Sequence, residues 1–444
     1  MFRQLEKNIQ PFMSFGAVAT LVQQTLAVAC DEHTSIDIWD DLKRVPNDLD
    51  LYYQPLTLTA DKIIETKHIK PESSPRISSI GHLGTVRSDL EATRFFRSIM
   101  AADGCPGDQP IFTSFQPFLN HLLFNDYIGH VGPFGMIRNT DGKTAIVKNK
   151  FPVSPEQLQR KLYFERYKNP SNALIELGIN PVTKSFWKLA YAEDPGVIDI
   201  HSADSKYSYI YVRKFKSGKT AAAALDKAMR EVIKRKPEHV IVDLTTSPGG
   251  HTDQASRLLS YFLNRSHQIA SKVYRRSRRV SVDKSFKSDS KQALKAMRSM
   301  ARQFRRTKRR GGKYTLNVRR RSFGHPDYKG KVTVLVSPLT HSAATMAALI
   351  LKKNRKATII GYQNAGSVHT SCFAALGTYS LRHTKLKVRI PGTCFLRSGS
   401  SRKNRGPLVP DIKVDPLAQP PGKLIHAIQE AAVQHVLKST KTDP

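Results

Sequence analysis

One serine stands where a short apolar strand gives way to a helix. The stretch PLTHSAATMAALILKK, Pro338 to Lys353, places Ser342 at the start of the helical pattern. A nucleophile there benefits from the helix dipole, and the amide of Ala343 can stabilise a developing oxyanion. The simpler interpretation is that Ser342 or Thr340 only caps the helix, as Ser and Thr commonly do. The residue types therefore indicate either a catalytic serine or a helix cap.

A second stretch that could do chemistry is VIVDLTTSPGG, Val240 to Gly250. An apolar strand runs into paired glycines, and a helix is expected to follow. Glycines at a strand end let the backbone approach a ligand closely and turn its N–H groups outward. The amides of Gly249 or Gly250 would therefore suit an oxyanion hole. The alternative is that Pro-Gly-Gly forms only a turn.

Both stretches lie in a region of alternating strands and helices that begins near residue 195. Strands are predicted at YSYIYVRKF, HVIVDL, KVTVLVS and ATIIGY, and helices at AAAALDKAMREVIKRK, ASRLLSYFLN and AATMAALILKK. This order is typical of an α/β fold. LGTYSLRHTKLKVRIPGTCF alternates like an antiparallel hairpin, and LIHAIQEAAVQHVLK is expected to form a closing helix.

The length of 444 residues allows two domains. Residues 31–180 are expected to form a mainly helical N-terminal domain, because SDLEATRFFRSIMAADG and FTSFQPFLNHLLFNDYIGH carry apolar residues at helical spacing. Residues 181–444 are expected to form the α/β core, with a basic insertion at about 272–321.

The charge is strongly positive, since 71 Lys and Arg against 36 Asp and Glu leave +35. The insertion holds 20 of these basic residues and 2 acidic ones, so we expect it to attract an anionic surface or an acidic partner. Its sequence predicts an amphipathic helix with the apolar residues Leu294, Met297, Ala301 and Phe304 and the basic residues Lys291, Lys295, Arg298, Arg302 and Arg305. No nucleic-acid-binding module is recognisable and few aromatic residues interleave with the basic run, so specific nucleic-acid binding is not expected.

The first 30 residues have roughly the layout of a secretory or lipoprotein signal. SFGAVATLVQQTLAVAC is mostly apolar and ends in small residues and Cys30. This predicts an exported protein that is periplasmic, secreted or lipid-anchored. The alternative is an ordinary amphipathic first helix. No apolar run reaches about 18 residues, so no transmembrane helix is expected.

The four cysteines, Cys30, Cys105, Cys372 and Cys394, have no metal-type spacing, and no metal or other cofactor is expected. In an exported protein, Cys372 and Cys394 could pair across neighbouring strands. Four buried thiols are the alternative.

The order of the motifs over residues 195–415 resembles the tail-specific (C-terminal processing) serine protease family, including its tricorn-core and retinoid-binding-protein-like branches. The matching segments are DLxxxPGG, TxSAAxxAA, IIGYxxAG and VPDIKVD, and no PDZ domain is recognisable. The resemblance implies a ClpP- or crotonase-like ββα spiral core. It also implies that Ser342 is the nucleophile, with the amides of Ala343 and of Gly249 or Gly250 as oxyanion donors.

The chain departs from the family pattern at several positions. Thr245 and Ser247 stand where the family has Arg and Asn, and Ser367 stands where the tail-specific branch has its lysine base. A Ser–Lys dyad at that position is therefore excluded. In VPDIKVD, Asp411 matches the family's Pro-Asp and either orients a histidine or only fixes a loop.

A serine hydroxyl is a weak nucleophile without a neighbouring base, and histidine is the usual one. The tricorn-like branch takes its histidine from the N-terminal region, which by analogy implies His130. His251, directly after the glycines, and His369, two residues past Ser367, are the alternatives. His341 is adjacent to the serine in sequence and is expected to point away.

Three functions follow from these patterns. The first is a serine endopeptidase that cleaves unfolded or C-terminal segments of proteins with Ser342 and a histidine base. The second is a catalytically inactive relative that binds peptides or an apolar ligand in the same cleft. The third is a protein whose basic face is its main function.

Overall fold

The computed structural model divides the chain into two compact units. The first contains residues 1–166, 274–316 and 371–395, and the second contains residues 167–273, 317–370 and 396–444. The structure describes residues 15–27, 34–37, 56–58, 63–65, 77–82, 85–88, 134–139, 144–148, 197–201, 207–212, 214–263, 266–275, 286–287, 298–299, 302–321, 323–324, 328–337, 340–355, 357–364, 367–381, 384–397, 406–415 and 424–441.

The second unit contains a six-stranded sheet with the order β19-β16-β15-β10-β9-β8. Its strands are β8 (Val197–His201), β9 (Tyr207–Val212), β10 (His239–Asp243), β15 (Lys331–Val336), β16 (Thr358–Gly361) and β19 (Ile412–Lys413). All neighbouring pairs are parallel except β8 with β9. Every residue of β9 and β10 is buried, as expected for parallel strands covered on both faces. The predicted α/β class is confirmed.

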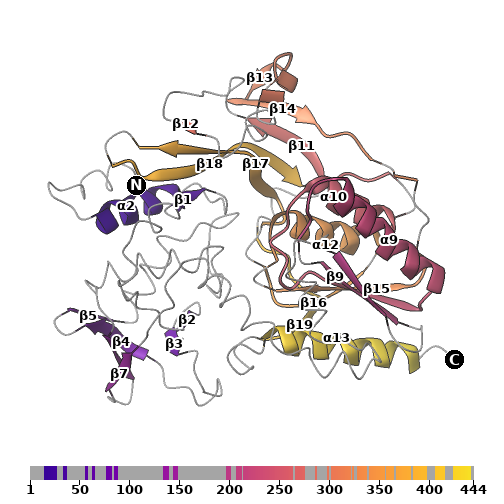
Figure 1. Cartoon of the computed structure of the whole chain (residues 1–444), viewed down its shortest axis with the longest axis horizontal. Helices are drawn as coiled ribbons and strands as arrows, with labels where there is room; N and C mark the ends of the chain where they lie inside the picture. The colour runs from indigo at the N-terminus through magenta and orange to yellow at the C-terminus, as the bar shows by residue number, and fades with distance from the viewer. Residues whose placement is uncertain are drawn as a thin grey trace. The chain divides into compact units, whose positions relative to one another are not determined.

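Helices cover both faces of this sheet (Figure 1). On one face lie α9 (Lys219–Arg235), α10 (Thr252–Ser260) and α12 (Ser342–Arg355), and on the other lies α13 (Leu424–Lys441). A core cluster joins α13 to the sheet through Tyr209, Ile241, Leu335, Ile428 and Val433. The helices predicted between the strands are confirmed.

Two loops meet at one edge of the sheet because the strands that precede them are parallel neighbours. β10 pairs with β15 in register from His239 with Lys331 to Asp243 with Leu335. The glycine loop follows β10 and the Ser342 turn follows β15, so both leave from the carboxyl ends of adjacent strands. Ligands of open α/β sheets bind at such ends.

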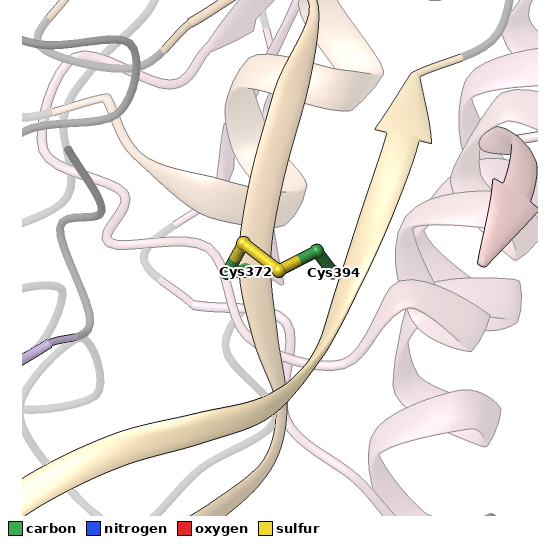
Figure 2. Close-up of a disulfide and its surroundings, with 2 residues drawn as sticks. All are labelled: Cys372 and Cys394. Atoms are coloured by element: carbon green, nitrogen blue, oxygen red, sulfur yellow. A yellow bond between two sulfur atoms is a disulfide. The ribbon is translucent and has the colours of Figure 1, made fainter. Parts of the chain in front are cut away.

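A seven-stranded sheet has the order β12-β17-β18-β11-β14-β13, with β1 also paired to β18. Its strands are β1 (Ser35–Asp37), β11 (Ala270–Arg275), β12 (Phe286–Lys287), β13 (Arg309–Arg310), β14 (Lys313–Asn317), β17 (Thr370–Ser380) and β18 (Lys387–Arg397). β17 and β18 form the predicted hairpin. A disulfide joins Cys372 to Cys394 across it, so of the two alternatives that the sequence left open for these cysteines, the structure has the pair and not buried thiols (Figure 2).

The described N-terminal residues form one helix and several short strands. The helix α2 (Phe15–Ala27) contacts β1, and the amide of Ile36 donates a hydrogen bond to Gln23 Oε1 at 2.9 Å. The strands that follow β1 are β2 (Leu56–Leu58), β3 (Ile63–Glu65), β4 (Ile77–His82), β5 (Thr85–Ser88), β6 (Phe134–Asn139) and β7 (Thr144–Lys148). Of the two stretches expected to be helical, residues 89–104 and 112–130 lie outside the described residues, whereas Ser88, the first residue of one of them, is the last residue of β5.

Within the described part of the chain, no helix has both the length and the apolar character needed to cross a membrane. In the basic insertion, residues 298–299 and 302–303 are helical. Phe304 is fully buried, whereas Arg302 and Arg305 are exposed, as the amphipathic pattern predicts. The other residues of that expected helix lie outside the described part.

Candidate active site

Ser342 is the first residue of α12 and has a left-handed backbone conformation, with φ of 53°. Only 4% of the residue is exposed. A residue other than glycine in this region costs on the order of 1 kcal/mol, and such strain concentrates at functional sites. The turn thus presents Ser342 on a sharp bend between β15 and α12.

Neither candidate hydroxyl caps α12. The amides of Ala344 and Thr345 donate to the carbonyl of His341, at 3.0 and 3.4 Å. The hydroxyl of Thr340 instead donates to the carbonyl of Leu244 at 2.8 Å. Within the described residues, the hydroxyl of Ser342 makes no hydrogen bond. The cap interpretation therefore leaves this hydroxyl unexplained.

Gly249 lies against the Ser342 turn more closely than any other residue type could. Its φ is +86°, and an added Cβ would lie 2.7 Å from the amide nitrogen of Ala343 and 2.8 Å from Cβ of Ser342. Because glycine has no Cβ, the two backbones can meet here. The loop after β10 is thus in direct backbone contact with the start of α12.

Phe215 fixes the orientation of the two glycines. Its amide donates to the carbonyl of Gly249 at 2.8 Å, and its carbonyl accepts from the amide of His251 at 2.7 Å. An added Cβ on Gly250 would collide with that Phe215 carbonyl. In the described structure, the amides of Gly249, Gly250 and Ala343 have no hydrogen-bond partner. They are therefore available donors for an oxyanion.

Four hydrogen bonds join the loop after β10 to the turn before Ser342. The amide of Leu244 donates to the carbonyl of Leu335, and the amide of His341 donates to the carbonyl of Ser247, both at 3.0 Å. Thr340 donates to Leu244 as described above, and the hydroxyl of Ser337 donates to the carbonyl of Thr245. Thr245 and Ser247, which replace the family's Arg and Asn, thus contribute backbone carbonyls to this junction.

Asp243, the last residue of β10, holds the loop after β10 in place and is 1% exposed. Its Oδ1 accepts from the amide and the hydroxyl of Thr245 at 2.8 and 2.6 Å, and its Oδ2 accepts from the hydroxyl of Tyr209. Gln429 of α13 donates to both the Tyr209 and the Asp243 side chains, at 3.2 and 3.4 Å. Burial raises the pKa of Tyr209 well above its usual value and the charge of Asp243 adds to the shift, so Tyr209 remains a donor.

Asn364, which follows β16, supports the serine turn from the other side. Its Nδ2 donates to the Thr340 carbonyl at 3.1 Å and to the Thr345 hydroxyl at 2.6 Å. Its Oδ1 accepts from the amide of Leu408 at 2.9 Å. Sequence reasoning missed both Asn364 and Asp243. The position of Asp243, an acidic residue at the end of the apolar run VIV, could have indicated its role.

Residues 206–414, which contain this whole site, match peptidase family S41. These residues, which make up just under half of the chain, are similar to peptidase family S41. The resemblance to the tail-specific proteases is thereby confirmed, and the family implies a protein or peptide substrate.

Solved structures of CPAF have a fold similar to that of this chain. The chain is similar to mature CPAF at 12% identity, with a TM-score of 0.50 over 98% of this chain and 89% of that chain. A serine-to-alanine mutant of CPAF gives 13% identity and a TM-score of 0.53, over 99% of this chain and 91% of that chain. At these identities the likeness shows the fold alone. No curated protein matches the chain in sequence.

Ser367, which stands where the tail-specific proteases have their lysine, lies in a small buried turn. Ser367 is fully buried, and its hydroxyl accepts from the amide of His369 at 3.0 Å. His369 is 8% exposed, and its carbonyl accepts from the amide of Arg397 at 2.9 Å. Ser367 therefore stabilises its own turn at the place where the family has a base.

The candidate bases are not joined to the serine in the described part of the structure. His251 is exposed at the start of α10, and neither it nor His369 makes a hydrogen bond to the Ser342 hydroxyl. His130 lies outside the described residues. In the described part, no group of three or more His, Cys, Asp or Glu side chains could hold a metal ion.

Asp411 makes its contacts at the edge of the six-stranded sheet. Its Oδ1 lies 2.5 Å from Nζ of Lys352, and its Oδ2 accepts from the amide of Ile359 at 2.9 Å. Its own amide donates to the Ile359 carbonyl at 2.8 Å. These contacts fix the segment that leads into β19.

Proposed function

We propose that the chain is a serine endopeptidase that cleaves unfolded or C-terminal segments of proteins. The observation that carries the proposal is the junction of Gly249 with the amide of Ala343 beside Ser342. It combines a nucleophile on a left-handed turn with backbone N–H groups that have no partner in the described structure. These are two of the parts that acyl transfer requires, and the third is a base.

The reaction follows from these groups. The hydroxyl oxygen of Ser342 attacks the peptide carbonyl carbon while a histidine takes its proton. The amides of Ala343 and of Gly249 or Gly250 stabilise the oxyanion of the tetrahedral intermediate. The C–N bond then breaks as the histidine returns the proton to the leaving amine. Water hydrolyses the acyl-enzyme by the same steps, which restores the serine.

We propose His130 as the base, on the family analogy, with His251 and His369 as alternatives. A base must come within about 3 Å of the serine hydroxyl in the complex with substrate. Of the two described alternatives, His251 is the exposed one and directly follows the glycine loop. His369 is buried, so its ring is less free to move.

The second candidate function is a protease-fold protein that binds peptides without cleaving them. It is favoured by Ser367 at the lysine position, where it supports a turn, and by a Ser342 hydroxyl with no hydrogen bond to a described side chain. In this case the three available amides would bind a peptide carbonyl or carboxylate.

We also propose that the protein is exported. The disulfide between Cys372 and Cys394 supports this, because such bonds persist in oxidising compartments and are rare in the cytosol. The apolar segment that ends at Cys30 has the composition of a signal.

The test separates a reactive serine from a proteolytic enzyme. Wild type, Ser342→Ala, His130→Ala and the control Ser439→Ala, which lies in α13, are compared for cleavage of casein and for labelling by a fluorophosphonate. Activity and labelling should be lost in Ser342→Ala and kept in Ser439→Ala. Loss in His130→Ala as well would identify the base, whereas retained activity there directs the search to His251 and His369. A folded wild type that neither cleaves nor labels would favour the binding function.

A further inference from the structure

The segment of residues 302–313, called here the basic segment, carries a dense group of positive charges outside the active site. Its exposed basic residues are Arg302, Arg305, Arg306, Lys308, Arg309, Arg310 and Lys313. The sequence contains no Asp or Glu from Ser290 to Pro326. The segment therefore has no acidic residue of its own.

An ordered scaffold holds these charges. Phe304 is fully buried, with the Arg275 guanidinium 5.8 Å from its ring centre, and the Thr307 hydroxyl donates to the Phe304 carbonyl at 2.7 Å. β13 and β14 form a hairpin through Gly311 and Gly312, whose φ values of 54° and 74° suit a tight two-residue turn. β14 lies beside β11 in the sheet (Figure 1).

The pairing across the hairpin brings like charges together. Arg310 lies directly opposite Lys313, an arrangement that destabilises an antiparallel pair. Lys313 lies 4.4 Å above the Tyr274 ring, and no described residue forms an ion pair with any member of the basic segment. One or two charges suffice to protect an edge strand from aggregation. The remaining positive charge is available to an external anion.

We propose that the basic segment docks the protein on the surface of an anionic phospholipid bilayer. Lys and Arg side chains near such a surface are attracted to it, and guanidinium groups bind phosphate oxygens well. The only exposed large hydrophobic residues in the described part are Ile390 and Val409, so the segment has no apolar side chain to insert. Docking is therefore electrostatic, reversible and weakened by salt.

Two observations favour lipid over nucleic acid. The exposed residues of the basic segment include no aromatic side chain on which a base could stack. The disulfide of the neighbouring β17–β18 hairpin indicates folding in an oxidising compartment, where lipid headgroups are an abundant phosphate surface. Both observations are independent of the proposed peptidase activity.

The test uses the full chain and co-sedimentation with vesicles of phosphatidylcholine alone or with added phosphatidylglycerol. One variant combines Arg306→Gln, Lys308→Gln, Arg309→Gln and Arg310→Gln. A matched control removes the same charge from exposed positions of α9: Lys219→Gln, Lys227→Gln, Arg230→Gln and Lys234→Gln. Wild type and the α9 variant should bind the anionic vesicles. The basic-segment variant should bind at least roughly tenfold more weakly.

A third variant, Arg306→Lys, Arg309→Lys and Arg310→Lys, keeps the charge and should keep the binding. Failure of folded wild type to bind anionic vesicles would overturn the proposal. Equal loss in the basic-segment and α9 variants would overturn it too, because net charge alone would then act. So would a basic-segment variant that loses duplex DNA binding but keeps vesicle binding.

Discussion

The two ends of strands β10 and β15 both bury polar side chains, but with different results. At the carboxyl ends, Asp243 and Thr340 hydrogen-bond to backbone groups of the loops that frame Ser342. At the amino ends, Nε2 of His239 lies 2.8 Å from the Thr333 hydroxyl, and the rings of His239 and His435 are 6.2 Å apart. The polar groups at the carboxyl ends hold the loops that carry the backbone amides. Those at the amino ends mainly contact one another.

The comparison shows that burial of polar groups does not by itself mark a functional site. What distinguishes the carboxyl end is its backbone: Gly249, Gly250 and Ser342 have positive φ values and bring together amides that have no hydrogen-bond partner within the described residues. At the amino end Nε2 of His239 has the Thr333 hydroxyl as its partner, whereas its buried Nδ1 has no hydrogen-bond partner within the described residues. Substitutions at the carboxyl end should therefore affect catalysis, and those at the amino end should affect folding.

The largest effect is expected for Gly249→Ala. The new Cβ would displace the amide of Ala343, so kcat should fall roughly 100- to 1,000-fold. The matched control is Gly218→Ala, which also has a positive φ, of +105°, but meets no atom within 4 Å. The control should lose about 1 kcal/mol of stability and keep its kcat. Equal kcat losses in the two variants, both shown to be folded by circular dichroism, would contradict the assigned role of Gly249.

The amino end should make stability dependent on pH. Burial lowers the pKa of His239 from 6.5 to about 4, and the charges of His435 and Lys331 add to the shift. Above pH 6.5 the histidine is neutral in both states, whereas between pH 6.5 and 4 the unfolded chain binds the proton more tightly. The free energy of unfolding should therefore fall by up to about 3 kcal/mol as the pH is lowered from 6.5 to 4. Urea unfolding at several pH values measures it, and His239→Gln should flatten the profile.

A smaller loss is expected for Asp243→Asn, because an amide cannot accept all the hydrogen bonds that the carboxylate accepts. We expect about 2 kcal/mol of lost stability and a lower kcat, measured by urea unfolding and casein cleavage. The control Asp253→Asn breaks an exposed ion pair with Arg321 and should cost less than about 1 kcal/mol. A stability loss with unchanged kcat would place Asp243 with the purely structural groups.

The smallest effects are expected at the edge of the sheet. Lys352→Gln removes a partly exposed ion pair with Asp411 and should cost at most about 1 kcal/mol. Asp411→Asn should leave kcat nearly unchanged, because its described contacts are Lys352 and the amide of Ile359. A fall in kcat of about tenfold or more would instead indicate that Asp411 orients a catalytic histidine.

The elements of the core could be predicted because each is specified by local pattern. The apolar run HVIVDL and the alternating residues of the β17–β18 hairpin suffice to identify strands, and the strand–helix order indicates a parallel sheet. The hairpin allowed Cys372 and Cys394 to pair, but the sequence did not decide between a disulfide and buried thiols. In contrast, Asn364 gave no local signal, since its partners Thr340 and Leu408 are distant in sequence.

The sequence by itself determined the alternation of strands and helices, the residue types at the turn and the concentration of positive charge at 302–313. These depend on period, composition and short motifs, which are local properties of the chain. Only the tertiary structure decided that Ser342 has a left-handed backbone, that Gly249 meets Ala343, and that Asp243 is held by Tyr209 and Gln429. The physical reason is that these contacts depend on parallel strands placing distant loops at one edge of the sheet.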